Sequence, residues 1–349
     1  MAGPVPPQGK LNGQLAHPTA VELGAAAVSG ALEKAGVDPA EVDVVIIGQV
    51  VQAGTGQNPA KQTSIMAGIC PEVPAVTINK VCLSGLTAVI DAARLIRAGE
   101  AGLVVAGGQE SMSRSPCLLP GVRQGWPYGG GQTTDSLVRD ALSDAQQEVS
   151  MGILAERGNQ VHRIERRAQD GIAVASHRRA AEASSNGIFK DEIVPIPVRK
   201  GLGKLIVNDE QVRPDANIEA LSQLRPAFTD GGSITAGDAS PLSDGAAALI
   251  LTTRANAERL KCKILAVVGP SGQVAGPDNL LHSQPSNATK AALARAGWTT
   301  EDLDFVEINE AFAAVAVQSL RELGIPADRC NLHDGAIASD TRLALRVHA

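Results

Sequence analysis

Aromatic residues, clustered charge and long apolar runs are all scarce in this sequence. Aromatics make up 2% of the 349 residues, so the core must be built from Ala, Val, Ile and Leu, with 36 glycines allowing close packing. Lys and Arg are spread along a chain of net charge −6, which argues against nucleic acid as a partner. No apolar run approaches the roughly 18 residues of a membrane span, and the N-terminus has no signal-peptide core. We therefore expect a soluble, cytoplasmic protein with no membrane partner.

Cysteine pairing is also absent. The five cysteines are an odd number and none belongs to a C-x-x-C pair, which argues against a disulfide framework. The same spacing argues against a zinc site, so we expect no metal. A cysteine outside such motifs is usually a small buried hydrophobic residue. A catalytic role is therefore considered only for a cysteine with a distinctive local sequence. The five are Cys70, Cys82, Cys117, Cys262 and Cys330.

Helical and strand patterns alternate at both ends of the chain, which predicts an α/β layered fold. The apolar run at 42–51 is typical of a strand that is buried on both faces. Further strands are predicted at 75–78 and 103–106. Helices are predicted at 21–35, 58–67 and 83–98.

The middle of the chain breaks this alternation. A Gly- and Pro-rich stretch is followed by a polar helix at 168–184 and a short strand at 192–198, and near Thr235 the chain returns to a buried strand. This organisation predicts an inserted loop domain. The expected division is 1–111 with 243–263 as the N-terminal half, 112–242 as the insertion, and 264–349 as the C-terminal half.

An internal repeat relates the two ends. Residues 31–48 and 292–309 align without a gap at an offset of 261, and seven of the 18 positions are identical. Helix–turn–strand units can resemble one another by chance, but an ungapped match with the turn glycine in register favours duplication. In the first copy the unit continues through a strand, a helix and another strand. The second copy stops earlier, so we expect it to lack its closing helix and strand.

Cys82 has the setting that the other cysteines lack. It lies between a predicted strand and the helix predicted to begin at Leu83. The free N–H groups and positive dipole of a helix start favour a thiolate, which is the nucleophilic form of cysteine. Asn309 ends a predicted buried strand, the position where ligand sites form in α/β sheets. Its alternative role is that of a helix N-cap.

The chain resembles the thiolase family over nearly its whole length. The family is built from two similar α/β halves with a loop domain in the first. Its members form dimers or tetramers, take coenzyme A thioesters as substrates, and need no metal or other cofactor. The resemblance rests on the stretches INKVCLSGL, VVAGGQESMS, FKDEIVP, TAGDASPLSDGAAAL, VEINEAFAAVA and NLHDGAIA, in this order.

The resemblance implies a role for five residues. Cys82 would accept the acyl group as a thioester, with its own N–H in an oxyanion hole, and Asn309 would hold a water in a second one. Ser240 and Arg213 would contact the pantetheine and adenine ends of coenzyme A, and Met151 would line the acyl pocket. Taken without the family, these last three would be a turn residue, a surface charge and core filler.

Two family motifs are not found in the sequence. The family carries G-H-P-x-G-x-S-G soon after G-G-A-I-A, and C-x-G-G-G further on, whereas here Gly335–Ala338 is followed by an unrelated tail at 339–349. The tail can be back-translated so that a one-base shift reads Leu-Gly-His-Pro-Leu-Gly-Ala-Ser-Gly-Thr-Arg. We therefore expect a one-base deletion near codon 338, which resequencing the gene would test. No role is given to His333 or His348.

Other positions also depart from the family pattern. The front end matches only at Pro7–Lys10, so an edge strand is expected to be missing. Leu83 and Ser150 replace a common Gly and His beside the acyl pocket. Asp238 and Pro241 replace a common Asn and Gly.

The predicted activity is condensation of two acetyl-CoA to acetoacetyl-CoA and CoA, or the reverse. Because the family's His and second Cys are not found, we expect little turnover, since general acid–base help is worth roughly 10²–10⁴ in rate. The alternatives are a longer-chain 3-ketoacyl-CoA thiolase and a CoA-binding remnant without turnover. A cysteine hydrolase lacks a matched His, and a dinucleotide dehydrogenase is weaker still, because Gly54 and Gly56 are not followed by a third glycine.

Overall fold

The computed structural model describes residues 5–126, 128–197 and 204–339. Its centre is a five-stranded mixed sheet in the order β1-β9-β4-β2-β3. Strands β2, β3 and β4 are parallel, whereas β9 runs antiparallel to β4 and β1. The strands are β1 (Gly9–Lys10), β2 (Val44–Gly48), β3 (Ala75–Ile78), β4 (Leu103–Ser111) and β9 (Ser243–Thr252).

Helices cover both faces of this sheet, as the α/β pattern predicts. Alternate side chains of the strands point to opposite faces, so the inward residues separate into two cores. Val45, Ile47 and Val105 pack under α1 and α2, whereas Ile46 and Val104 pack under α3. The helices are α1 (Ala20–Ala35), α2 (Pro59–Met66) and α3 (Ser84–Ala98).

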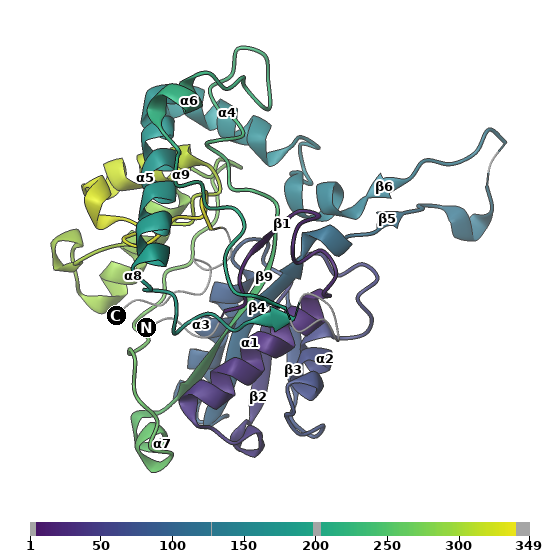
Figure 1. Cartoon of the computed structure of the whole chain (residues 1–349), viewed down its shortest axis with the longest axis vertical. Coiled ribbons are helices and arrows are strands. Elements are labelled where there is room, and N and C mark those ends of the chain that lie inside the picture. The colour runs from purple at the N-terminus through teal and green to yellow at the C-terminus, as the bar shows by residue number, and fades with distance from the viewer. Residues whose placement is uncertain (1–4, 127, 198–203, 340–349) are drawn as a thin grey trace.

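The residues between β4 and β9 form a separate layer of helices and a projecting arm (Figure 1). The arm is a hairpin of β5 (Cys117–Leu118) and β6 (Thr134–Asp135), followed by a π-helical turn at Val138–Leu142. Helices α4 (Met151–His162), α5 (Arg166–Ser185) and α6 (Ile218–Ser222) lie above the sheet in Figure 1. Strands β7 (Ile196–Pro197) and β8 (Leu205–Ile206) pair with each other.

The remaining helices are α7 (Arg254–Arg259), α8 (Gln284–Ala296) and α9 (Ala313–Leu323), and α9 packs against α5, α4 and α8. Short 3₁₀ turns occur at Pro39–Glu41, Met112–Arg114, Val122–Gln124, Thr300–Asp302 and Ala327–Arg329. No helix in the described part of the chain is long and apolar enough to cross a membrane.

The sequence repeat is also a repeat of backbone structure. Gly36 and Gly297 both end their helices in the left-handed conformation, with φ of 65° and 69°. The turns Pro39–Glu41 and Thr300–Asp302 follow at the same offset of 261. The amide of Val45 donates to the carbonyl of the residue before β3, and Val306 makes the corresponding bond to the carbonyl of Arg329. Identical caps, turns and pairings are hard to reach by chance, so the structure supports the duplication.

Most of the predicted elements are present, and three predictions need correction. Asn309 does not end a strand, because Val306 makes only an isolated parallel bridge to Cys330. In the first half, β2 is paired with β4 on one side and with β3 on the other. Between residues 204 and 339 the structure shows no counterpart of β4, so the segment before Asn309 has a neighbour on one side only and forms no continuous strand pairing. A short edge strand, β1, does form within Pro7–Lys10, and the strand predicted at 192–198 shrinks to Ile196–Pro197.

Candidate active site

Cys82 lies in a tight turn between β3 and α3, at the carboxyl end of the parallel strands. Its side chain is exposed, and its neighbours Val81 and Leu83 are about half exposed. The helix begins two residues later, at Ser84. The turn therefore presents the thiol to solvent close to the positive end of the α3 dipole, as the sequence predicts.

Side chains on either side of Cys82 fix this turn. Asn79 Oδ1 accepts a 2.9 Å bond from the amide of Val81, which has a φ of +50°. Ser84 Oγ accepts from the amide of Lys80 at 2.8 Å and donates to the carbonyl of Val81 at 2.7 Å. A positive φ is strained for a β-branched residue, and strain of this kind persists where surrounding bonds over-determine the conformation.

The buried carboxylate of Glu110 also stabilises this turn. Glu110, near the end of β4, accepts bonds at 2.9 and 3.1 Å from the amides of Val50 and Val51. The carbonyl of Val50 in turn accepts from Asn79 Nδ2 at 3.2 Å. Desolvation raises the pKa of Glu110 to about 7, against the lowering effect of these amides. The sequence reasoning did not identify Glu110, although it lies within the quoted VVAGGQESMS stretch.

Three of the predicted residues lie in or beside stretches of the chain that contact one another. Met151, at the start of α4, packs against a cluster that contains Phe312 and Ala239. Ser240 follows Ala239, and its amide donates to the carbonyl of Ala311 at 3.1 Å. Asn309 is half-buried and lies at the end of the segment that leads into Ala311. The stretches 235–240 and 309–313, which are about 70 residues apart in sequence, are therefore adjacent in space.

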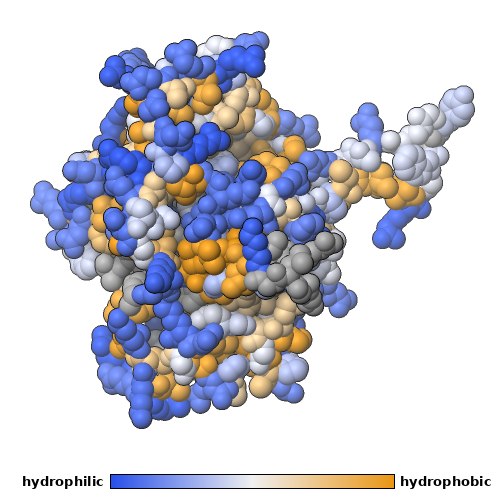
Figure 2. Space-filling model, in the orientation of Figure 1, coloured by the Kyte–Doolittle hydropathy of each residue, from blue (hydrophilic) through white to orange (hydrophobic). Residues whose placement is uncertain are grey.

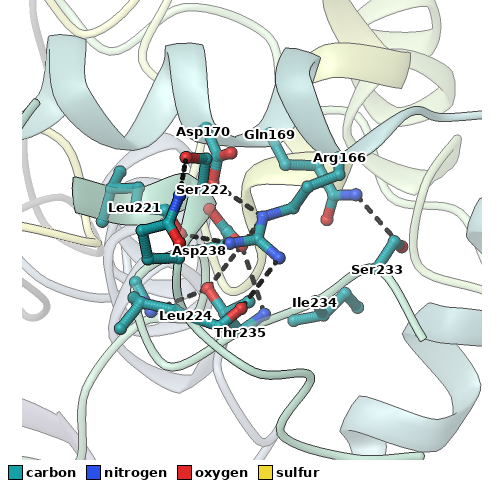
Figure 3. Close-up of polar contacts among 12 residues, drawn as sticks. Arg166, Gln169, Asp170, Leu221, Ser222, Leu224, Ser233, Ile234, Thr235 and Asp238 are labelled. Atoms are coloured by element: carbon teal, nitrogen blue, oxygen red, sulfur yellow. Dashed lines mark hydrogen bonds and ion pairs between the residues drawn. The ribbon is translucent and has the colours of Figure 1, made fainter. Parts of the chain in front are cut away.

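An ion-pair network holds the 233–240 loop from the other side (Figure 3). The guanidinium of Arg166 on α5 bonds Asp170 at 2.8 Å and lies 3.5 Å from Asp238. It also donates to the carbonyls of Leu221 and Leu224. Asp238 Oδ2 accepts from the hydroxyl of Thr235 at 2.7 Å, which closes the loop on itself. Desolvation, with Asp170 nearby, raises the pKa of Asp238 to about 6 although Arg166 lowers it.

The quoted NLHDGAIA stretch lies beside these residues. The hydroxyl of Ser240 donates to the carbonyl of Ala336 at 3.1 Å. Asn331 forms two bonds to Ile308 through its amide group, of 2.8 and 3.0 Å. The residue after Asn309 is Glu310, which is 3% exposed and whose pKa burial raises to about 7. Glu310 was not identified from the sequence because its partners are distant in the chain.

Arg213 has an exposed side chain. Its amide donates to Nδ1 of His177 on α5 at 3.3 Å. Burial of the His177 ring, followed by the charge of Arg213, lowers the pKa of His177 to about 4. The neutral imidazole can therefore accept this bond throughout the physiological pH range.

This arrangement provides an exposed thiol in the β3–α3 turn and polar groups where residues 235–240 contact 309–313. In the described ranges no three His, Cys, Asp or Glu side chains meet as metal ligands would. Two cavities lie elsewhere. One, of about 450 Å³, is at the tip of the arm around Trp126, and the other, of about 400 Å³, is between α4 and α8 beside His162 and Lys290.

Comparison with known proteins identifies a family. Residues 4–255 match the family model "Thiolase, N-terminal domain", and residues 262–341 match "Thiolase, C-terminal domain". A "Probable acetyl-CoA acetyltransferase" of Mycolicibacterium smegmatis is 49% identical over 97% of this chain and 88% of its own length. An "Acetyl-CoA acetyltransferase" of Chromobacterium violaceum is 47% identical over 95% of this chain and 85% of its own length.

A solved structure agrees with these relatives. The crystal structure of the Bacillus anthracis acetyl-CoA acetyltransferase matches with a TM-score of 0.93 at 35% identity, covering 99% of this chain and 87% of that chain. These alignments cover 97%, 95% and 99% of this chain, and they give no evidence of the truncation that the sequence predicts. The tail at 340–349, where the sequence predicts a shifted frame, lies outside the described residues.

Proposed function

The chain belongs to the thiolase family, with the family's α/β fold, and we propose that it is an acetyl-CoA acetyltransferase that works through an acetyl thioester on Cys82. The reaction joins two acetyl-CoA molecules into acetoacetyl-CoA and CoA, or runs in reverse. The observation that carries the proposal is the exposed Cys82 thiol, held in a fixed turn at the start of α3. A structural cysteine would be buried instead.

The first half-reaction is a thioester exchange. The Cys82 thiolate attacks the carbonyl carbon of acetyl-CoA, and the C–S bond to CoA breaks as the C–S bond to Cys82 forms. The sulfur of CoA leaves with the electron pair and is protonated. The positive end of α3 and the backbone N–H of Cys82 would stabilise the oxyanion of the tetrahedral intermediate.

The residues around Asn309 and Ser240 would bind and polarise the second thioester. We assign Asn309 to a water that polarises its carbonyl group, and Ser240 to the pantetheine arm. Met151 is assigned to the acyl pocket because it packs beside Phe312 and Ala239. These two residues belong to the same chain stretches as Asn309 and Ser240. Arg213 is assigned to the adenine end, where its exposed guanidinium can reach a charged ligand. The division into 1–111 with 243–263, 112–242 and 264–349 belongs to the same proposal, as does a cytoplasmic location.

Self-association as a dimer or tetramer is part of this proposal, and the arm supports it. A hairpin with two paired residues on each strand is too short to be stable alone in water. Its loop nevertheless carries Leu119, Val122 and Trp126 with 45%, 42% and 53% of their surface exposed. Figure 2 shows hydrophobic residues along this arm, which projects from the rest of the molecule. A second copy of the chain would cover them.

Acylation is the experiment that tests the proposed function. Purified protein is incubated with acetyl-CoA or acetoacetyl-CoA, and intact mass and peptide mass spectra locate the added acetyl group. We expect one acetyl group on Cys82, none in Cys82→Ser, and unchanged labelling in Cys117→Ser, which removes another exposed cysteine. Acetoacetyl-CoA compared with a longer 3-ketoacyl-CoA then tests the chain-length alternative. An unlabelled Cys82 with intact, folded protein would exclude the proposal.

A further inference from the structure

Glu310 is a buried carboxylate that accepts hydrogen bonds from three donors. Oε1 accepts from Nδ2 of Asn331 at 2.7 Å, and Oε2 accepts from the amide of Ile337 at 3.2 Å. The hydroxyl of Ser176 on α5 supplies a further side-chain bond. Three donors from two parts of the chain, residues 331–338 and α5, therefore converge on one side chain, and an ionised carboxylate can accept from all of them.

The segment that Glu310 holds is the one that contacts the proposed site. Asn331 and Ile337 lie at the two ends of residues 331–338, and Ala336 within it accepts the Ser240 hydroxyl. Asn331 also bonds both the amide and the carbonyl of Ile308. Asn309 thus lies between two residues, Ile308 and Glu310, that are fastened to the same segment.

The backbone of residues 331–338 passes close to this carboxylate. A Cβ added at Gly335 would lie 2.1 Å from Glu310 Oε2, well inside van der Waals contact. The segment therefore passes directly over the carboxylate, and glycine is needed for the approach. This close fit, together with the bonds from Asn331 and Ile337, couples the position of Glu310 to that of residues 331–338.

The internal repeat provides a comparison for this position. At the offset of 261, Glu310 corresponds to Gln49, which is 1% exposed. Gln49 accepts through Oε1 from Gln109 and donates through Nε2 to the carbonyl of Val51. A site that needs one acceptor and one donor holds an amide, whereas a site that offers three donors holds a carboxylate.

From these contacts we propose that Glu310 is a positioning residue, which sets Asn309 and Ser240 relative to each other by fixing residues 331–338. The proposal rests on the proposed roles of those two residues in binding coenzyme A thioesters. Glu310 itself touches no reacting atom. Its effect passes through the Ser240–Ala336 bond and through the Ile308–Asn331 bonds.

The charged and titratable groups around Glu310 define a pH window. Asp334 repels its charge, and the Cys330 thiol lies next to it. Arg179 on α5 bonds the carbonyls of Cys330 and Asn331 and helps to hold the same segment. Burial raises the pKa of Glu310 to about 7, so the carboxylate predominates above that pH. Because the raised pKa means that the closed segment binds the proton more tightly than the open one, residues 331–338 should open more readily as pH rises through 7.

Hydrogen exchange and coenzyme A affinity test the proposal on the full-length protein at pH 6 and pH 8.5. In Glu310→Gln at pH 8.5, we expect amide exchange within 331–339 to rise roughly tenfold or more, and the dissociation constant for CoA to rise several-fold. The wild type should be better protected at pH 6 than at pH 8.5, after correction for intrinsic exchange, because the raised pKa of Glu310 favours the closed segment at the lower pH. The variant should show no such pH dependence. Glu110→Gln is the matched control, because it also neutralises a carboxyl group of raised pKa but leaves 331–339 at wild-type protection.

Several outcomes would overturn the proposal. Wild-type exchange and CoA affinity in Glu310→Gln would do so, and so would wild-type protection that is equal at the two pH values. The wild-type pH comparison stands even if the variant does not fold. The titration of CoA phosphates is common to all variants and cancels in their ratio. If Cys82 of the wild type takes no acetyl group while exchange responds as expected, the proposed function is wrong and the role of Glu310 in fixing 331–338 stands.

Discussion

Replacing Arg166 by Met should reveal how much of the site depends on one ion-pair network. The guanidinium is 24% exposed, whereas its partners Asp170 and Asp238 are 3% and 0% exposed (Figure 3). Met fills much of the same volume but carries no charge. The substitution therefore leaves two buried carboxyl groups beside each other without a cation.

The expected cost follows from the burial of these groups. Removing one partner of a buried ion pair typically costs 3–5 kcal/mol, and the partial exposure of Arg166 places the estimate at about 3 kcal/mol. The cost depends on pH. The pKa of Asp238 is raised from 3.8 to about 6, so its contribution to stability is complete below about pH 4 and is lost as pH rises through 6. Without Arg166 this pKa rises further, and the destabilisation should grow between pH 5 and pH 8.

Urea unfolding at both pH values measures the effect, with Asp238→Asn and the double variant completing a thermodynamic cycle. Asp238→Asn removes one of the two carboxylates, so Arg166→Met should cost less by about 1–2 kcal/mol in that background. Arg167→Met is the control for charge loss on the same helix. A cost below about 1 kcal/mol, or one that is equal at pH 5 and pH 8, would refute the reasoning.

Three further predictions concern other parts of the chain. Gly48→Ala places a Cβ 2.5 Å from the carbonyl carbon of Ser84, so acetylation of Cys82 should slow and the free energy of unfolding should fall by about 1–3 kcal/mol, whereas Gly171→Ala, with open space around it, should be neutral or stabilising. Glu110→Gln should remove about 3 kcal/mol of pH-dependent stability, because the raised pKa of about 7 makes the wild type lose stability as pH rises from about 4.5 through 7; equal pH profiles in urea would contradict this. Trp126→Ser at the arm should reduce the molar mass measured by light scattering, whereas Trp298→Ser, on an equally exposed residue elsewhere, should not; an unchanged mass in both would remove the arm from the interface.

The elements that present Cys82 could be predicted from the sequence because their signals are local. A continuous apolar run indicates a strand buried on both faces, and β2 occupies Val44–Gly48 within the predicted 42–51. The helix predicted at 83–98 is α3, ending at Gly99 in the left-handed conformation. The glycine, the alternation and the apolar spacing all act within a few residues, so they can be read without tertiary contacts.

The strand predicted before Asn309 shows the limit of such signals. Its sequence matches that of β2 at the offset of 261, and its first pairing, between Val306 and Cys330, does form. An extended segment joins a sheet only when neighbouring strands are in place to pair with it, however. In the described residues, the segment before Asn309 has one such neighbour. Local pattern supplies the tendency to extend, and the rest of the sheet decides whether a strand results.

The sequence by itself determined the repeat and the position of Cys82 before α3. It also determined the resemblance to the family, from which Asn309, Ser240, Arg213 and Met151 were predicted to belong to one site. Tertiary structure alone decided which buried charges support them. Arg166 pairs with Asp238, which lies more than 70 residues later in the sequence. Glu310 bonds Ser176, which lies far earlier in the sequence. Neither pairing has a local signal, because a carboxylate gives the same letter in a sequence whether it is solvated or buried. Only the fold removes water from it and makes the position of each donor matter.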